Sequence, residues 1–482
     1  MSIDAIIKQV ESNEKAAIER LVDWLKIPSV STDPACAGDC RKAAEWAALR
    51  LREAGLTVEL HETGTKEKPG HPIVWATSPG TGKGPHVLFY GHYDVQPPDP
   101  MDLWESPPFK PVIRPADPGV KNKVPGERIV ARGAVDDKGQ VACFLEALLA
   151  WKQAGPKEGL PIRLSVLLEG EEESGSVNLD AYVHKHKDTL KQADICVISD
   201  TGMLGRGLPA ITYGVRGLAY TECILHAANQ DLHSGLWGGR CPNPISELTK
   251  VLAQLWDADR RVTIPGFYDK VRDIEAQEKL NWSKLPIDSI EALATIGLKP
   301  EANVGEKGFN ATEREWARPT AEINGIYGGY MAKGAKTVIP SHAGAKVSFR
   351  LVADQNPDEI AKKFKAWLDA RTPPGCRWEF INHSGGWPGT VSTSSPYLTA
   401  ASKALERAGG TSPYLIKSGG SIPVVGLLKS ELGLDTILMG FGLEDDRVHS
   451  PNEKFELDCF RLGMKAHAIL IEELSRLPAA KR

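Results

Sequence analysis

The sequence lacks the features that mark membrane proteins and nucleic-acid-binding proteins. No stretch approaches the roughly eighteen uninterrupted apolar residues of a membrane span, and the N-terminal segment alternates charged with apolar side chains, without the apolar core of a signal peptide. The 58 basic residues nearly balance the 62 acidic residues, which leaves a net charge of −4. A nucleic-acid-binding domain normally carries a basic excess. We therefore expect neither nucleic acid nor a membrane as a partner.

Cysteine is also scarce, with eight residues spread through a chain of 482. The only close pair, Cys36 and Cys40, has no second pair with which to build a zinc ribbon. Dispersed cysteines in a long chain are typical of reduced thiols rather than of a disulfide framework, so we expect a cytoplasmic protein. The rest of the composition, 41% hydrophobic and 25% charged, is that of an ordinary globular chain.

Strands and helices alternate through the first 213 residues. Apolar runs at 86–90, 163–168 and 195–199 are typical of buried strands, and helical periodicity appears at 141–153. Alternation of helices with continuously apolar strands predicts an α/β fold, with a mixed, mostly parallel sheet flanked by helices. The same character returns after residue 385.

The pattern changes near residue 214. Alternation of apolar and polar residues predicts strands with one solvated face. The expected elements are strands at 220–226, 346–352 and 377–381, helices near 246–254 and 357–370, a polar stretch at 265–318 and a turn-rich stretch at 324–340. Their order predicts a small α+β domain inserted into the larger one. The expected domains are 1–213, 214–384 and 385–482, of which the first and third form one unit.

Five short segments rich in His, Asp and Glu stand mostly where an apolar strand ends. They are 91–94, 134–139, 169–176, Asp200 and 445–450. Ligands of open α/β sheets bind beyond the carboxyl ends of the strands, so these segments would converge on one rim. Each segment alone also fits a structural histidine, a solvated acidic loop or a helix N-cap. Together, imidazoles and carboxylates without thiolates suit a catalytic zinc pair, because cations relieve the repulsion among the carboxylates. The residues alone leave both interpretations open.

A wider set of motifs extends over nearly the whole chain. It comprises Tyr90–Pro97, Arg132–Gly139, Glu169–Ser176, Ile198–Asp200, Asp231–Gly235, Gly334–Pro340, Gly419–Pro423 and His449–Glu453. In content and order these motifs resemble the aminoacylase/carnosinase family of dinuclear zinc metallopeptidases, and within it the dipeptidase branch. The resemblance implies a zinc-exopeptidase-like catalytic domain and an inserted ferredoxin-like domain that serves as a lid and for dimerisation.

The resemblance also implies a metal site. His92 and Asp200 would bind one zinc ion, Glu173 and His449 would bind the other, and Asp136 would bridge them. The implied cofactor is two Zn²⁺ ions per subunit, with Mn²⁺ or Co²⁺ as substitutes.

Three further residues gain implied roles beside the metals. Glu172 would be the general base, Asp94 would orient His92, and the peptide bond between Asp136 and Asp137 would be cis. Glu171, the first acid of the run, receives no role.

In the inserted domain the resemblance assigns substrate contacts. His233 would reach into the neighbouring subunit of a homodimer and stabilise the oxyanion, and Arg350 would bind the free carboxylate of the substrate. Thr337 and Ser421 match substrate-contacting positions. Lys417–Ser418 departs from the Arg-Glu that is frequent in the family, a change that bears on which end of the substrate is favoured.

The implied reaction is metal-dependent hydrolysis of dipeptides or other small peptides by a zinc-bridged hydroxide, with Glu172 as the base. The alternative within the family is an N-acyl-amino-acid deacylase or carbamoylase, because the same metal pair cleaves other amides. A metal-free binding protein with this fold is a third hypothesis, and the filled ligand positions speak against it.

Overall fold

The computed structural model describes residues 3–81, 84–115 and 126–479. Its contacts divide the chain into two compact units, the first made of residues 1–213, 391–416 and 428–482, and the second of residues 214–390 and 417–427. The sequence predicts the boundaries after residues 213 and 384, whereas the second unit extends to residue 390 and includes the later segment. No helix in the described part of the chain has both the length and the apolar character needed to cross a membrane.

The first unit is built on a mixed sheet in the order β1-β2-β6-β3-β7-β17-β8. Its four central strands, β6, β3, β7 and β17, run parallel to one another. All seven residues of β3 are buried, as expected of a strand covered on both faces. The strands are β1 (Thr57–His61), β2 (Ile73–Ser78), β3 (His86–His92), β6 (Arg163–Glu169), β7 (Ile195–Ile198), β17 (Thr436–Leu438) and β8 (Ala210–Val215).

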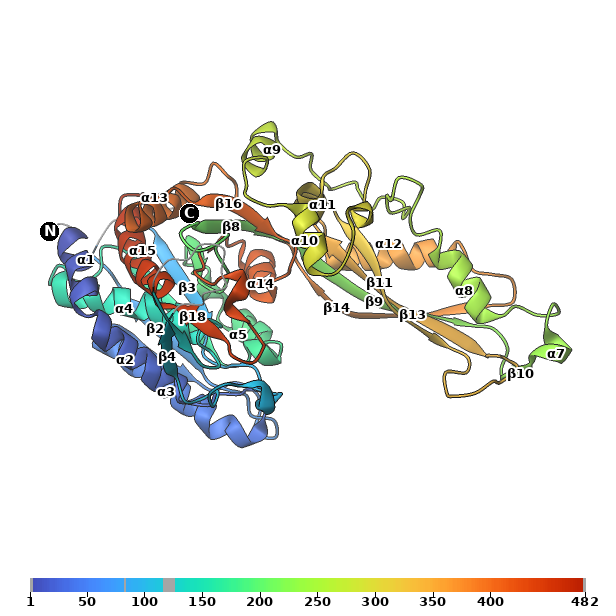
Figure 1. Ribbon diagram of the computed structural model, residues 1–482, viewed down its shortest axis with the longest axis horizontal. Coiled ribbons are helices and arrows are strands. Elements are labelled where there is room, and N and C mark those ends of the chain that lie inside the picture. The colour runs from blue at the N-terminus through green and yellow to red at the C-terminus, as the bar shows by residue number, and fades with distance from the viewer. Residues whose placement is uncertain (1–2, 82–83, 116–125, 480–482) are drawn as a thin grey trace. The chain divides into compact units, whose positions relative to one another are not determined.

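Helices from both ends of the chain pack beside this sheet. Helix α15 lies between α13 and α4 (Figure 1), and α4 is buried along most of its length. The helices are α1 (Ile3–Ser12), α2 (Glu14–Leu25), α3 (Ala37–Glu53), α4 (Lys138–Ala154), α5 (Leu179–Lys185), α6 (Lys187–Leu190), α13 (Pro396–Gly409) and α15 (Leu457–Ser475). A small sheet joins β18 (Lys454–Glu456), β5 (Glu127–Val130) and β4 (Val112–Pro115).

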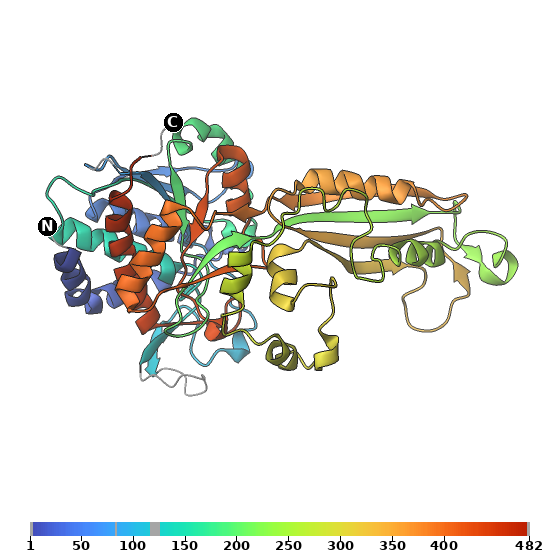
Figure 2. The ribbon, with the colours of Figure 1, turned by 90° about the horizontal axis from the view of Figure 1, so that it is seen from above.

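The second unit is a four-stranded antiparallel sheet in the order β11-β13-β9-β14. Along the chain its elements follow the strand–helix–strand–strand–helix–strand order of a ferredoxin-like fold. Burial alternates along β9, so one face of the sheet packs on α8 and α12 and forms a core with them (Figure 2). The main elements are β9 (Gly217–His226), α8 (Pro244–Leu252), β11 (Thr320–Gly328), β13 (His342–Leu351), α12 (Pro357–Asp369) and β14 (Arg377–Gly386).

Shorter elements complete the second unit. The polar stretch predicted at 265–318 contains three short helices, and β11 occupies the start of the stretch predicted to be turn-rich. The additional elements are β10 (Leu232–His233), α7 (Ser234–Trp237), α9 (Ala276–Trp282), α10 (Ser289–Thr295), α11 (Ala311–Ala317), β12 (Val338–Ile339) and β15 (Gly389–Thr390). Strand β16 (Tyr414–Ser418) and helix α14 (Pro423–Leu432) cross the boundaries of the segment 417–427.

Candidate metal centre

Parallel strand ends gather acidic and imidazole side chains in the first unit. His92 is the last residue of β3, which lies between β6 and β7. The chain leaves β6 at Glu169 and forms a short 3-10 helix over Glu172–Ser174, and it leaves β7 two residues before Asp200. Because neighbouring parallel strands end on the same edge of a sheet, the segments that follow β3, β6 and β7 lie close together.

Five side chains form two groups in which the candidate ligand atoms lie within 4.8 Å of one another. One group is His92, Asp136 and Asp200, and the other is Asp136, Glu173 and His449. Asp136 belongs to both: its Oδ1 is 3.1 Å from His92 Nε2, and its Oδ2 is 2.9 Å from His449 Nε2. One carboxylate therefore offers one oxygen to each group, as a bridging ligand does.

The electrostatics of these groups fit cations. Hydrogen bonds to Asp136 and Glu173 raise the pKa of His449 to about 10, and burial, together with the nearby Asp136 charge, raises the pKa of Asp200 to about 8. Oε1 of Glu173 is buried and has no hydrogen-bond partner among the described residues. The raised pKa values show that the crowded carboxylates stabilise positive charge on or near this site. A divalent cation would neutralise these carboxylates and would give the buried oxygen of Glu173 a partner. The donor set of two imidazoles and three carboxylates suits zinc or a similar metal.

Asp94 connects the two halves of the centre. Its Oδ1 lies 3.4 Å from Nδ1 of His92, and its Oδ2 accepts a hydrogen bond from the backbone N–H of Glu173 at 3.0 Å. The backbone carbonyl of Asp94 lies 3.1 Å from the same imidazole nitrogen. The two contacts to Nδ1 fix the orientation of the His92 ring, so that its Nε2 faces Asp136. The peptide bond between Asp136 and Asp137 is cis.

Glu172 stands beside the ligands but outside both groups. Its side chain is partly buried, and burial raises the pKa of its carboxyl above the ordinary value, an effect that the nearby His92 opposes. The Glu172 carboxylate accepts no hydrogen bond from any other residue that the structure describes, whereas Gln96 Nε2 donates to Oε2 of the adjacent Glu173 at 2.7 Å. Glu172 is thus a partly buried carboxylate that lies beside the two ligand groups and has a raised pKa.

Glu453 supports the loop that carries Asp136, a role that the sequence did not reveal. Its side chain is fully buried and accepts hydrogen bonds from Arg132 Nη1 at 2.7 Å and from the backbone N–H groups of Gly133, Val135 and Asp136 at 3.0, 2.9 and 3.1 Å. The only signal in the sequence was its place in the motif His449–Glu453. Its carboxylate fixes the backbone of the loop that carries the candidate ligand Asp136.

Glu171, which received no role from the sequence, anchors the acidic loop. Its side chain is buried and accepts hydrogen bonds from the backbone N–H groups of His71 and Asn178 at 2.9 and 3.1 Å, and from Asn178 Nδ2 at 2.9 Å. Two backbone N–H groups, of Ser174 and Ser176, also donate to its carbonyl. The first acid of the run therefore holds the turn from which Glu172 and Glu173 project.

The predicted substrate-contacting residues lie in the second unit and form two separate pairs. His233 of β10 is aligned with Val338 of β12, and the carbonyl of Thr337 accepts a hydrogen bond from the backbone N–H next to His233. Arg350 is near the end of β13, and its Nη1 donates to Ser421 Oγ at 3.0 Å. The first pair lies near the start of β13, where Asp231 Oδ1 accepts from Ser341 N, so the two pairs stand at opposite ends of the strand.

Comparisons with known proteins agree with this architecture. The chain is 30% identical over 494 residues to the Cys-Gly metallodipeptidase DUG1 of Saccharomyces cerevisiae, covering 99% of each. It is 29% identical to the Beta-Ala-His dipeptidase of Mus musculus, covering 98% of this chain and 96% of the relative. The solved structure of the metallo-carboxypeptidase Sso-CP2 from Sulfolobus solfataricus has a TM-score of 0.77 and 32% identity, with 96% of this chain and 99% of that one covered.

The sequence model of peptidase family M20/M25/M40 matches residues 88–473, which include all five candidate metal ligands. The resemblance inferred from the motifs is confirmed, as is the α/β fold with its inserted domain. The chain belongs to peptidase family M20/M25/M40 and is a metallopeptidase.

Proposed function

We propose that this metallopeptidase hydrolyses dipeptides with two divalent cations bridged by Asp136. The observation that carries the proposal is the pair of ligand groups that share this carboxylate, with Glu172 beside them. The relatives named above are dipeptidases, and the structural neighbour is a carboxypeptidase. The deacylase alternative has no such support, because the amidase neighbour of the hydantoinase/carbamoylase family is only 13% identical and bears on the fold alone.

In this proposal His92 and Asp200 would hold one cation, Glu173 and His449 would hold the other, and Asp136 would serve both. The proposed ions are two Zn²⁺ per subunit, with Mn²⁺ or Co²⁺ as substitutes. When bound, such a pair polarises the peptide carbonyl and lowers the pKa of water toward 7. Asp94 contacts both the His92 ring and the backbone N–H of Glu173, and so fixes their positions relative to each other.

Glu172 is the proposed proton carrier. Its carboxylate takes a proton from the attacking water and delivers it to the amine that leaves. Burial helps in this role, because a pKa raised above that of an exposed Glu brings the group nearer to the working pH.

The separation of His233 from Arg350 supports a homodimer. The eight residue steps from His342 to Arg350 span roughly 26 Å along β13, at about 3.3 Å per step. An extended dipeptide spans only about 7 Å. A dipeptide held by Arg350 and Ser421 therefore cannot contact His233 and Thr337 of the same chain, and we propose that a second copy supplies that pair.

A cytoplasmic location completes the proposal. All eight cysteines are unpaired, as in proteins of reducing compartments.

The test begins with metal-free protein. After zinc or manganese is added back, we expect turnover of Xaa–Xaa dipeptides and little turnover of N-acetyl or N-succinyl amino acids. Glu172→Gln should lower kcat by about 10²–10⁴-fold while binding zinc with unchanged stoichiometry. Glu158→Gln, a change of an exposed carboxylate in the same unit, is the matched control. Near-normal turnover by metal-loaded Glu172→Gln would refute the assignment of the base.

A further inference from the structure

The two imidazoles of the metal centre are held in different ways. His92 is fully buried, and Asp94 contacts its Nδ1 with both a carboxylate and a backbone oxygen. The side chain of His449 is 53% exposed, and its Nδ1 has no hydrogen-bond partner among the residues that the structure describes. Only its Nε2 is engaged, by the candidate ligands Asp136 and Glu173. No side chain therefore orients His449 as Asp94 orients His92, and its placement depends on its backbone.

The backbone around His449 has an unfavourable conformation. In the His449 loop (residues 447–453), Arg447, His449 and Asn452 have φ angles of 58°, 61° and 65°. Positive φ is disfavoured for residues that carry a Cβ, although Asn tolerates it better than the other two. One hydrogen bond within the loop, from the N–H of Ser450 to the carbonyl of Arg447, spans only a single turn. Such a conformation persists where the surrounding structure imposes it.

Lys454 joins the two ends of the His449 loop. Its buried ammonium group donates to Asp446 Oδ1 at 2.8 Å and to Glu456 Oε1 at 3.1 Å, and it lies 3.1 Å from Asp445 Oδ2. The two aspartates end the short 3-10 helix before the loop, whereas Lys454 and Glu456 belong to β18 after it. Asp446 is also fully buried, and its Oδ2 accepts from the N–H of Leu443 at 2.7 Å. A buried pair with these further bonds fixes the two ends of the loop relative to each other.

The two sides of the His449 loop are attached unequally. Asn452, on the far side, binds a neighbouring segment with both side-chain atoms: its Oδ1 accepts from the N–H of Glu105, and its Nδ2 donates to the carbonyl of Leu103, both at 2.8 Å. Residues 447 and 448, on the near side, form no hydrogen bond outside the loop within the described chain. The near side is therefore held at its start, by Asp446.

We propose that Lys454 is a positioning residue for the cation site that contains His449. It contacts no candidate metal ligand; by holding Asp446, it keeps the His449 imidazole beside the other ligands of that site. The inference rests on the two-cation site of the proposed function and adds that the two cations depend on different supports. Because Asp94 orients His92 without the His449 loop, loss of the Lys454–Asp446 pair affects one cation only.

The test is a titration of metal-free protein with Co²⁺, whose visible absorption depends on its ligands. Lys454→Met removes the ammonium group and keeps the length of the side chain. We expect the first equivalent of Co²⁺ to bind within about threefold of wild type and the second to bind about 10- to 100-fold more weakly. The spectrum of the variant with one cobalt should match that of His449→Ala with one cobalt and differ from that of His92→Ala. Excess metal should restore turnover, because no reacting group is changed.

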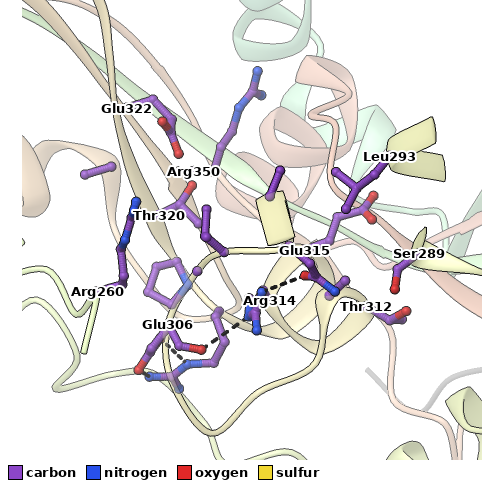
Figure 3. Close-up of a pocket in the computed structure, with 18 of the residues that line it drawn as sticks. Arg260, Ser289, Leu293, Glu306, Thr312, Arg314, Glu315, Thr320, Glu322 and Arg350 are labelled. Carbon is purple, nitrogen blue, oxygen red and sulfur yellow. Dashed lines mark hydrogen bonds and ion pairs between the residues drawn. The ribbon is translucent and has the colours of Figure 1, made fainter. Parts of the chain in front are cut away.

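A second variant and a control accompany Lys454→Met. Asp446→Asn removes the charge that pairs with Lys454, while its amide oxygen can still accept from Leu443, and it should show the same selective loss of the second equivalent. The control is Glu306→Gln. Glu306 is buried and paired with Arg318 at 2.8 Å in the wall of a pocket in the second unit (Figure 3). The control should lose stability and bind both equivalents as wild type does. Circular dichroism of each variant confirms that it is folded.

The pattern of loss decides the inference. Equal weakening of both equivalents in Lys454→Met and Asp446→Asn would show a general loss of structure, and unchanged binding would show that the pair does not position His449; either result overturns the inference. If the wild type bound no cation, the proposed function would fail, and hydrogen exchange of metal-free protein would still decide the inference. Exchange at 447–452 should be about tenfold faster or more in Lys454→Met, because the loop loses a charged hydrogen bond, and unchanged in the control. Equal exchange in Lys454→Met and wild type would contradict the positioning role.

Discussion

The role of Glu453 gives a quantitative prediction. This fully buried carboxylate belongs to neither group of candidate metal ligands, yet it holds the loop that carries Asp136. Its Oε1 accepts from the N–H groups of Val135 and Asp136, and its Oε2 accepts from Arg132 and the N–H of Gly133. In Glu453→Gln one oxygen keeps two of these bonds, and the new NH₂ group faces two donors. Two lost bonds to a charged acceptor cost about 1.5–3 kcal/mol each, and a broken buried ion pair costs about 3–5 kcal/mol.

We therefore expect Glu453→Gln to lower the free energy of unfolding by about 3–5 kcal/mol and to weaken zinc binding about 10- to 100-fold, as loss of an outer support does at metal sites. Urea unfolding of metal-free protein measures the first quantity, and competition with a chromogenic chelator measures the second. Glu473→Gln is the control, because Glu473 is also buried and paired with Arg407 and Arg476, but on α15. It should lose stability without losing zinc affinity. Wild-type zinc affinity in Glu453→Gln would refute the reasoning, as would an equal loss of affinity in the control.

Three other predictions concern stability and the acidic loop. Glu171→Gln should lower kcat/KM about tenfold or more and speed hydrogen exchange at 172–176, because the loop loses its charged anchor; unchanged exchange would contradict this role. Burial lowers the pKa of His467 to about 3 against about 6.5 unfolded, so the unfolded chain binds the extra proton. The free energy of unfolding should therefore fall by about 1.4 kcal/mol per pH unit below pH 6.5. Urea unfolding of metal-free protein at a series of pH values measures this dependence, and His467→Gln should lack the contribution. A Cβ on Gly139 would lie 1.8 Å from the carbonyl oxygen of Ala134, whereas one on Gly38 meets nothing within 4 Å. Gly139→Ala should therefore lower the free energy of unfolding strongly, by about 3 kcal/mol or more, and Gly38→Ala in α3 should raise it slightly, as measured by urea unfolding.

The parallel sheet and the rim that carries the metal groups could be predicted because both depend on local patterns. Continuous apolar runs identify buried strands, and the rule that ligands meet beyond the carboxyl ends of strands places His92 and Asp200 together. The pairing of Asp136 with both histidines required the family resemblance, because no local pattern says which acid reaches two neighbours.

The supporting residues could not be predicted, because their partners are distant in sequence. Glu453 contacts Asp136 across 317 residues, and Glu171 contacts His71 across 100. An acid in such a run looks like a solvated loop until the fold buries it.

The second unit shows where local signals misled. Strand β11 was missed because Gly325 and Gly328 suggest turns, whereas the register shift between Ile323 and Gly325 is a bulge within a continuous strand. At the start of the chain, apolar residues recur at helical spacing without an obvious break, yet the structure has two helices there, α1 and α2, that meet at Asn13. Asn13 Nδ2 donates to Gln153 Oε1, a contact that periodicity cannot reveal.

The separation of 317 positions between Asp136 and Glu453 has a consequence for synthesis on the ribosome. At about 5–20 residues per second, the anchor is made roughly 15–60 s after the loop that it holds. During that interval the loop of Asp136 has neither Glu453 nor His449, whereas residues 214–390, the larger part of the second unit, have already been made. Metal uptake should therefore be a late event in the life of the nascent chain, and zinc capture by stalled chains of increasing length would show when the last segment docks.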